Sequence, residues 1–334
     1  EKIPVVKEEI KEVQEEVKIK EMNENYRKPL IIQRADPFIY KHEDGYYYFI
    51  ASVPSYDRIE LRRSRTIAGL AYATPRTIWR KHETGEMSKL IWAPEIHYIA
   101  GKWYIYFAAT HTEEIIDGLF THRMYCLECE AQDPMVDENW HEKGQVVSHL
   151  DTFCLDATVF EHNNHLYYVW AQKDNAIEGN SNLYIAEMTN PWTLKTEPVM
   201  LTKPEFAWEC KGFKVNEGPA VLMRNGKIFI TYSASATDEN YCMGMIYADL
   251  ESDLLKRENW TKVTEPVFQS DLSTQQYGPG HNSFTIAEDG ETDILVYHCR
   301  DYTEIKGDPL YDPNRHTKVQ AFGWGNDGFP IFGK

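Results

Sequence analysis

The chain has 334 residues, of which 42% are hydrophobic and 13% aromatic, and its formal net charge is -17. This acidic charge disfavours binding to nucleic-acid phosphates, and no apolar run approaches the roughly 20 residues that cross a bilayer. We therefore expect one large β or α/β domain, or two smaller ones, with a neutral and soluble partner.

The first 28 residues differ in composition from the rest of the chain. They are rich in Lys and Glu and contain no aromatic residue before Tyr26. This pattern fits a solvated helix with charged pairs three and four residues apart, and it equally fits a disordered spacer. We expect residues 1–28 to lie outside the main domain, which we place at residues 29–334.

Five blocks of similar pattern follow. Each begins with a small or acidic residue, runs through a short strand, turns at Gly or Asn, and returns as an aromatic strand. They are DPFIYKHEDGYYYFIAS, APEIHYIAGKWYIYFAAT, DATVFEHNNHLYYVWAQ, EGPAVLMRNGKIFITYSAS and HNSFTIAEDGETDILVYHCR, with starts 57, 63, 61 and 64 residues apart. Each block reads as a β-hairpin. Repetition near every 60 residues predicts an all-β fold, a five-bladed β-propeller; the alternative is a β-sandwich with coincidental hairpins.

In a propeller, the first strand of every blade lines the central channel. The first residues of the five blocks should therefore meet at one mouth of that channel. They are Asp36, Ala93, Asp156, Glu217 and His281. Three carboxylates in one pocket can cleave a glycosidic bond, with one acid donating a proton and another activating water. They can also bind a cation such as calcium, or simply accept backbone N–H groups at strand starts.

The motifs at these five positions resemble those of a known family. RADPF, WAPEIH, LDATVF, NEGPAV and GPGHNSF, in this order and spacing, are similar to glycoside hydrolase family 43 over about residues 30–334. Members of that family are five-bladed propellers that cleave arabinose- and xylose-containing polysaccharides with inversion. The stretch RDYTEIKGDPLYDPNRHTKVQ resembles the branch of exo-acting α-L-arabinofuranosidases of 1,5-linked arabinan.

The resemblance implies a role for each carboxylate. Asp36 matches the general base that activates water, and Glu217 matches the general acid. Asp156 matches the third acid, which raises the pKa of Glu217 and orients it. Because an inverting reaction needs room for a water molecule, we expect the carboxyl groups of Asp36 and Glu217 to be roughly 6.5 to 9.5 Å apart.

The resemblance also bears on His281 and on cofactors. His281 is either a histidine hydrogen-bonded in a polar channel or a ligand, direct or through water, of a central ion, which the family often carries as calcium. One histidine with waters is an unusual calcium site, because calcium prefers oxygen ligands. We expect the chemistry to need no cofactor and any calcium in the channel to be structural.

Five further residues are candidates for substrate binding. Arg300 either forms a surface ion pair with Asp301 or reaches into the pocket to hold a sugar hydroxyl. Trp92 either packs in the core or forms a platform for a pentose face. Candidates for the pocket wall are Phe38, Phe153 and Gln320.

Together these features predict an inverting enzyme that releases terminal α-L-arabinofuranosyl units from arabinan or arabino-oligosaccharides, with exo action on α-1,5 links. A β-xylosidase, an arabinoxylan debrancher and an endo-arabinanase of the same fold are alternatives. A non-catalytic carbohydrate-binding propeller is a more remote one.

The six cysteines read as buried, unpaired thiols, because the C-x2-C at residues 126–129 lacks the second ligand pair of a zinc site. They favour the cytoplasm. A role in polysaccharide trimming and a non-Met start followed by a charged spacer favour export instead. We expect a secreted or periplasmic protein.

Overall fold

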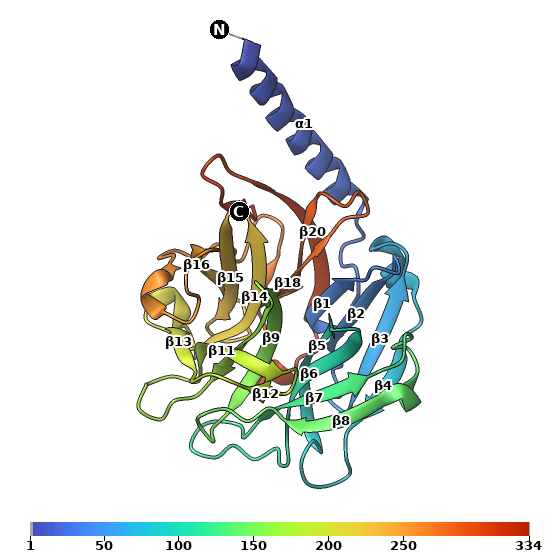
Figure 1. Ribbon diagram of the computed structural model, residues 1–334, viewed down its shortest axis with the longest axis vertical. Coiled ribbons are helices and arrows are strands. Elements are labelled where there is room, and N and C mark those ends of the chain that lie inside the picture. The colour runs from blue at the N-terminus through green and yellow to red at the C-terminus, as the bar shows by residue number, and fades with distance from the viewer. Residues whose placement is uncertain (1–2, 334) are drawn as a thin grey trace.

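A computed structural model describes residues 3–333 of the chain (Figure 1). Nearly all of its regular secondary structure is antiparallel sheet, arranged as five separate sheets. The first sheet contains β1 (Ala35–Lys41), β2 (Tyr47–Ser52), β3 (Arg58–Ser64) and β4 (Arg76–Arg80). The second contains β5 (Lys89–Ile99), β6 (Lys102–Thr110), β7 (Arg123–Cys129) and β8 (Trp140–Gln145). The third contains β9 (Cys154–His162), β10 (His165–Gln172), β11 (Asn182–Asn190), β12 (Thr193–Leu194) and β13 (Val199–Thr202).

The last two sheets repeat the same order. The fourth contains β14 (Asn216–Arg224), β15 (Lys227–Ala234), β16 (Cys242–Asp249) and β17 (Thr261–Lys262). The fifth contains β18 (Tyr277–Ile286), β19 (Asp293–Arg300), β20 (His316–Trp324) and β21 (Pro330–Ile331). Short 3₁₀ helices interrupt the connections: η1 (Ala68–Tyr72), η2 (Asp137–Asn139), η3 (Ala207–Glu209), η4 (Arg257–Asn259) and η5 (Pro309–Tyr311).

The five sheets are the blades of a ring. Their first strands, β1, β5, β9, β14 and β18, each contact the next, and β1 also contacts β18. The ring is closed by main-chain hydrogen bonds in which Leu30 N and Thr317 N donate to Thr317 O and Ile31 O, both at 2.9 Å. The predicted five-bladed β-propeller is therefore confirmed.

The predicted hairpins also form, and their turns explain the positions of Gly and Asn. Three of them have positive φ at both central residues: Ala100 and Gly101, Asn163 and Asn164, and Asn225 and Gly226. This is the type I′ geometry, whose twist matches that of the flanking strands and which favours Asn and Gly.

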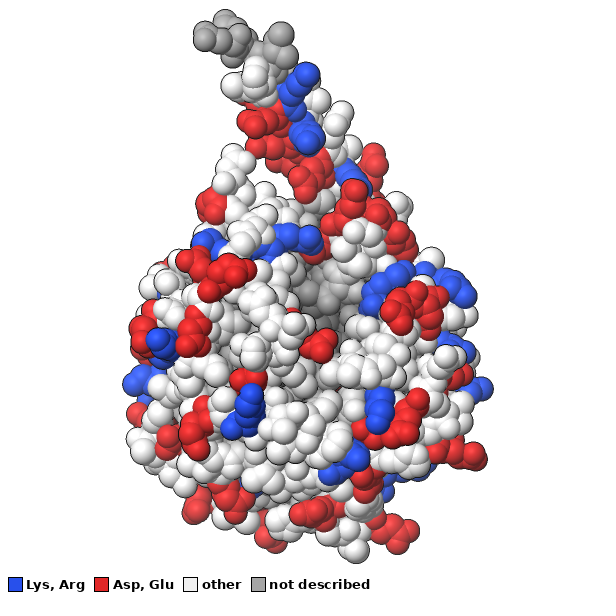
Figure 2. Space-filling view, viewed as in Figure 1, with Lys and Arg blue, Asp and Glu red and all other residues white. Residues whose placement is uncertain are grey.

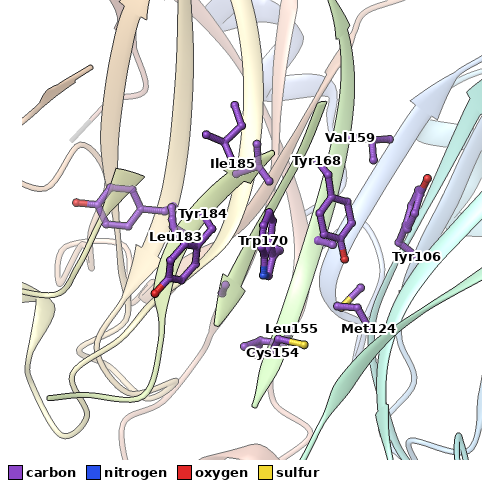
Figure 3. Packing of buried hydrophobic residues seen from close by; sticks show 14 of the residues in the cluster. Tyr106, Met124, Cys154, Leu155, Val159, Tyr168, Trp170, Leu183, Tyr184 and Ile185 are labelled. Carbon is purple, nitrogen blue, oxygen red and sulfur yellow. The ribbon is translucent and has the colours of Figure 1, made fainter. Parts of the chain in front are cut away.

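Aromatic side chains from these hairpins fill the space between blades. Figure 3 shows Tyr168 and Trp170 of β10 beside Tyr106 of β6, and the rings of Tyr168 and Tyr106 lie 6.0 Å apart. Rings of this size bury large areas and dominate the packing energy. All six cysteines are free thiols, as predicted, and five are buried; Cys210 is half-buried.

Residues 1–28 contain the only α-helix among the described residues, α1 (Ile3–Asn25), which projects from the fifth blade (Figure 1). Its C-terminal end is attached to the propeller. Ile19 and Met22 pack against the core, and Asn23 exchanges two hydrogen bonds with the main chain of Ala321, at 2.7 and 3.1 Å. Of the two alternatives for this segment, the helix is the one present. Figure 2 shows acidic side chains along it and over the visible face of the propeller.

Candidate active site

Four of the five predicted blade-start residues line one cavity of about 200 Å³. Asp36 comes from β1, Asp156 from β9, Glu217 from β14 and His281 from β18. Because these are the first strands of their blades, the ring brings together residues up to 245 positions apart in the sequence. The predicted convergence of the three carboxylates is thus present in the structure.

The backbone at these positions follows one pattern in every blade. Each first strand contains a register shift of the kind a β-bulge produces, with one residue of positive φ at the equivalent place. These residues are Asp36 (56°), Ala93 (46°), Asp156 (60°), Gly218 (56°) and His281 (44°). Positive φ is strained for residues other than glycine and is often found at functional sites. In the fourth blade the equivalent residue is Gly218, so the alignment of Glu217 with the other blade starts is wrong by one position.

This offset gives Glu217 a different place from the other two acids. Its equivalents in the second and third blades are Trp92 and Leu155, because each of these precedes the residue of positive φ. All three side chains line the cavity. Glycine at position 218 leaves room for the ring of His281, since a Cβ there would lie 3.2 Å from it.

Asp36 is held as a carboxylate by several donors. His281 Nδ1 lies 3.1 Å from its Oδ1, Ser52 Oγ donates to its Oδ2 at 2.5 Å, and Arg315 lies 3.8 Å away. Although burial would raise the pKa of Asp36, the charges of His281 and Arg315 hold it well below its usual range. Asp36 is therefore ionised at neutral pH, as a general base must be.

Glu217 has the opposite electrostatic environment. Burial and the nearby charge of Asp156 raise the pKa of its carboxyl to about 8. The hydroxyl of Tyr241 donates a hydrogen bond to its Oε1 at 2.9 Å. A carboxyl group with this pKa is largely protonated at neutral pH, which is the state a general acid requires.

Asp156 lines the same cavity and is buried. Its Oδ2 accepts the main-chain N–H of Gly218 at 3.0 Å and lies 3.8 Å from His281 Nδ1. Burial raises the pKa of Asp156 to about 6, with the charge of Asp36 adding to the rise and His281 opposing it. Through Gly218, Asp156 also fixes the backbone next to Glu217.

His281 carries the positive charge at the centre of this group. Burial alone would lower the pKa of its imidazole, but Asp36 and Asp156 together raise it to about 10. Among residues 3–333, no three His, Cys, Asp or Glu side chains are placed to share an ion. A calcium ion held by His281, directly or through water, stays a prediction.

The predicted substrate-binding residues divide into two groups. Trp92 and Phe153 line the cavity. The indole of Trp92 stacks on the imidazole of His122, with ring centroids 3.6 Å apart, and its buried Nε1 has no protein partner.

Three predicted residues lie outside the cavity lining. Phe38 follows the bulge of β1 and packs against His97. Gln320 is on β20, the third strand of its blade, and lies in the groove beside α1. Arg300 is fully buried and donates to main-chain oxygens of Thr237 and Pro309. Arg300 therefore holds the 301–315 loop, and it neither forms the surface ion pair with Asp301 nor lines the pocket, the two alternatives expected from the sequence.

Several lining or supporting residues have no counterpart in the sequence predictions, Arg315 and Tyr241 among them. Arg315, at the opposite end of the same loop, lines the cavity and faces Asp36. Tyr241 supports Glu217, and its ring is parallel to that of His298, with centroids 5.5 Å apart. Arg315 lies in the stretch singled out for its resemblance, but nothing in that stretch marks it as the residue that faces Asp36. Nothing in the sequence around Tyr241 marks it.

Residues 26–330 match the family model described as Glycosyl hydrolases family 43. The chain belongs to this family. It is 53% identical over 308 residues to a protein of Streptomyces avermitilis named extracellular exo-alpha-(1->5)-L-arabinofuranosidase, covering 92% of this chain and 63% of that protein. A Streptomyces chartreusis protein of the same name is 53% identical over 284 residues, 85% of each chain.

Among solved structures, an alpha-L-arabinofuranosidase from Lactobacillus brevis superposes on this family 43 chain with a TM-score of 0.93. It is 67% identical in sequence, with 93% of this chain and 97% of that one covered. A thermostable family-43 glycoside hydrolase, 22% identical, shares the fold with a TM-score of 0.72. No helix in the described part of the chain is long and apolar enough to span a membrane.

Proposed function

We propose that this family 43 chain is an inverting, exo-acting α-L-arabinofuranosidase that releases terminal arabinofuranosyl units from α-1,5-linked arabinan or arabino-oligosaccharides. The observation that carries the proposal is the pairing of an ionised Asp36 with a protonated Glu217 in one cavity. The names of the Streptomyces and Lactobacillus relatives supply the sugar.

In this mechanism, Asp36 takes a proton from a water molecule as the water oxygen attacks the anomeric carbon. Glu217 donates its proton to the glycosidic oxygen as the bond between that oxygen and the anomeric carbon breaks. The product is arabinose of inverted configuration and a free alcohol, and the two carboxyl groups then exchange protons with solvent. His281 and Arg315 keep Asp36 ionised, and Asp156 keeps the pKa of Glu217 high. No cofactor takes part in these steps.

Exo action is supported by the size of the cavity. Its volume of about 200 Å³ is below the roughly 300 to 1,000 Å³ typical of pockets for drug-sized ligands, which suits one terminal pentose better than an internal stretch of polymer. Trp92 and Phe153 supply apolar wall surface against which a furanose ring packs. The name "extracellular" of the two Streptomyces relatives supports secretion.

The test is product analysis on linear 1,5-arabinan, arabinoxylan, and the nitrophenyl arabinofuranoside and xyloside. Monomeric arabinose from the linear polymer, first formed as the inverted anomer by NMR, is the expected result. Short oligomers would indicate an endo-acting enzyme. Release of xylose alone would overturn the assignment of arabinose as the released sugar. No release from any substrate would favour a non-catalytic binding propeller.

A matched pair of variants tests the acid. Glu217→Gln should lower kcat by at least about 10²-fold, because general acid catalysis contributes typically 10² to 10⁴-fold. Glu258→Gln, a substitution of an exposed glutamate on η4, should leave kcat unchanged. Equal kcat in the two variants would remove Glu217 from this role.

A further inference from the structure

The mouth of the cavity is formed largely by two loops with apolar side chains. One loop joins β6 to β7 and contributes Ile115, Gly118, Leu119 and Phe120; the other leads into β14 and contributes Phe213 and Val215. None of these six residues has a polar side chain. Ile115 and Phe213 are 57% and 51% exposed, so these two side chains face solvent at the entrance, whereas Val215 is buried. Polar side chains of Asn180, Thr237 and Asp308 also line the cavity, outside these two loops.

The position of this surface relative to Glu217 indicates that the leaving group of the substrate covers it. Val215 and Phe213 precede Glu217 by two and four residues in the chain, just before β14 begins at Asn216. A general acid lies beside the leaving-group oxygen, so the group attached to that oxygen passes the side chains next to the acid. The apolar mouth is therefore continuous with the place where the leaving group lies.

The chemistry of the mouth suits some leaving groups better than others. A sugar carries hydroxyl groups on most of its carbons, and each hydroxyl that loses water without gaining a partner costs free energy. The six residues above have no side-chain donor or acceptor to replace that water. A hydrocarbon leaving group has no such requirement, and it gains by covering exposed apolar surface.

We propose that the mouth formed by Ile115, Gly118, Leu119, Phe120, Phe213 and Val215 is a binding site for an apolar leaving group. It would take arabinofuranosides of long-chain alkyl alcohols in addition to arabinose oligomers. This inference rests on the proposed function, because it assigns the leaving-group side of that same site.

The test compares methyl with n-octyl α-L-arabinofuranoside, because both release simple primary alcohols and differ mainly in apolar length. We expect kcat/KM for the octyl glycoside to be at least tenfold higher. In the double variant Ile115→Ser, Phe213→Ser, the octyl-to-methyl ratio should fall at least fivefold. Leu272→Ser removes a leucine that is 75% exposed outside the cavity, and it should leave the ratio unchanged. An octyl-to-methyl ratio near one, or a ratio that the double variant does not alter, would overturn the proposal.

A binding measurement separates this proposal from the proposed function. Calorimetric titration of the Glu217→Gln variant with the same two glycosides measures their binding affinities without turnover. If neither glycoside is hydrolysed by the unmodified protein, the proposed function fails. The titration still tests whether the mouth binds the octyl group. Octyl binding at least tenfold tighter than methyl supports it, and equal affinities overturn it.

Discussion

The imidazole Nδ1 of His281 lies 3.1 Å from Asp36 Oδ1 and 3.8 Å from Asp156 Oδ2. A single cation thus contacts the proposed base and lies close to the third acid. Without it, two neighbouring carboxylates would repel one another, and one would take up a proton. Its position allows Asp36 to stay ionised while Glu217, whose Oε1 accepts from Tyr241, keeps a high pKa.

The alkaline limb of the pH–activity profile should report Glu217. A general acid works only while protonated, so activity should fall as pH rises through about 8. The hydrogen bond from Tyr241 lowers the pKa of Glu217, so Tyr241→Phe should move this limb to higher pH. Measurement of kcat against pH for both proteins checks the shift. A limb that stays in place, or moves to lower pH, would contradict the assignment of the acid.

The acidic limb should report Asp36 and its dependence on Arg315. A base works only while ionised, so a low pKa extends activity to acidic pH. Arg315→Met removes a cation 3.8 Å from Asp36 and should raise its pKa, which moves the acidic limb of kcat/KM to higher pH. Arg76→Met, at an exposed position on β4, serves as control. Identical acidic limbs in the two variants would show that Arg315 does not act on Asp36.

Gly218→Ala should damage both stability and activity. The added Cβ would lie 3.2 Å from the His281 ring, at a φ of 56°. Gly226→Ala shares a positive φ of 72° but meets nothing within 4 Å, so it isolates the backbone strain of about 1 kcal/mol. In denaturant unfolding we expect Gly218→Ala to lose about 1 kcal/mol more than Gly226→Ala, with kcat lowered only in the former. Similar losses in both would mean that the site adapts to the methyl group.

Truncation tests whether α1 is separate from the catalytic propeller. Removal of residues 1–17 leaves Ile19, Met22 and Asn23 in place, so Tm and kcat should not change. Removal of residues 1–25 takes away those apolar contacts and both hydrogen bonds to Ala321. We expect Tm to fall by about 5 °C, with kcat unchanged at 25 °C. A loss of kcat in the shorter truncation would place α1 in the catalytic unit.

The sequence predicts the ring and its carboxylates because a repeated hairpin leaves a repeated pattern in the chain. It places Glu217 in the wrong register, because it aligns Glu217 with Asp36 and Asp156 by residue type. The backbone instead aligns Gly218 with them, since all three have positive φ. Arg300 and Arg315 lie at the two ends of one loop. The sequence does not show which of the two is buried against the loop backbone and which faces Asp36. Gln320 failed as a pocket residue for a simpler reason: it lies on the third strand of its blade, away from the channel.

The shared bulge of the five first strands has a consequence for how such a site is built at all. Five like blades around an axis present five equivalent positions, whereas an inverting hydrolysis needs an acid and a base that differ in protonation. The symmetry must therefore be broken, and here it is broken in the fourth blade by one residue. Gly218 takes the position that Asp36 and Asp156 have in their blades. Glu217 takes the preceding position, which Trp92 has in the second blade.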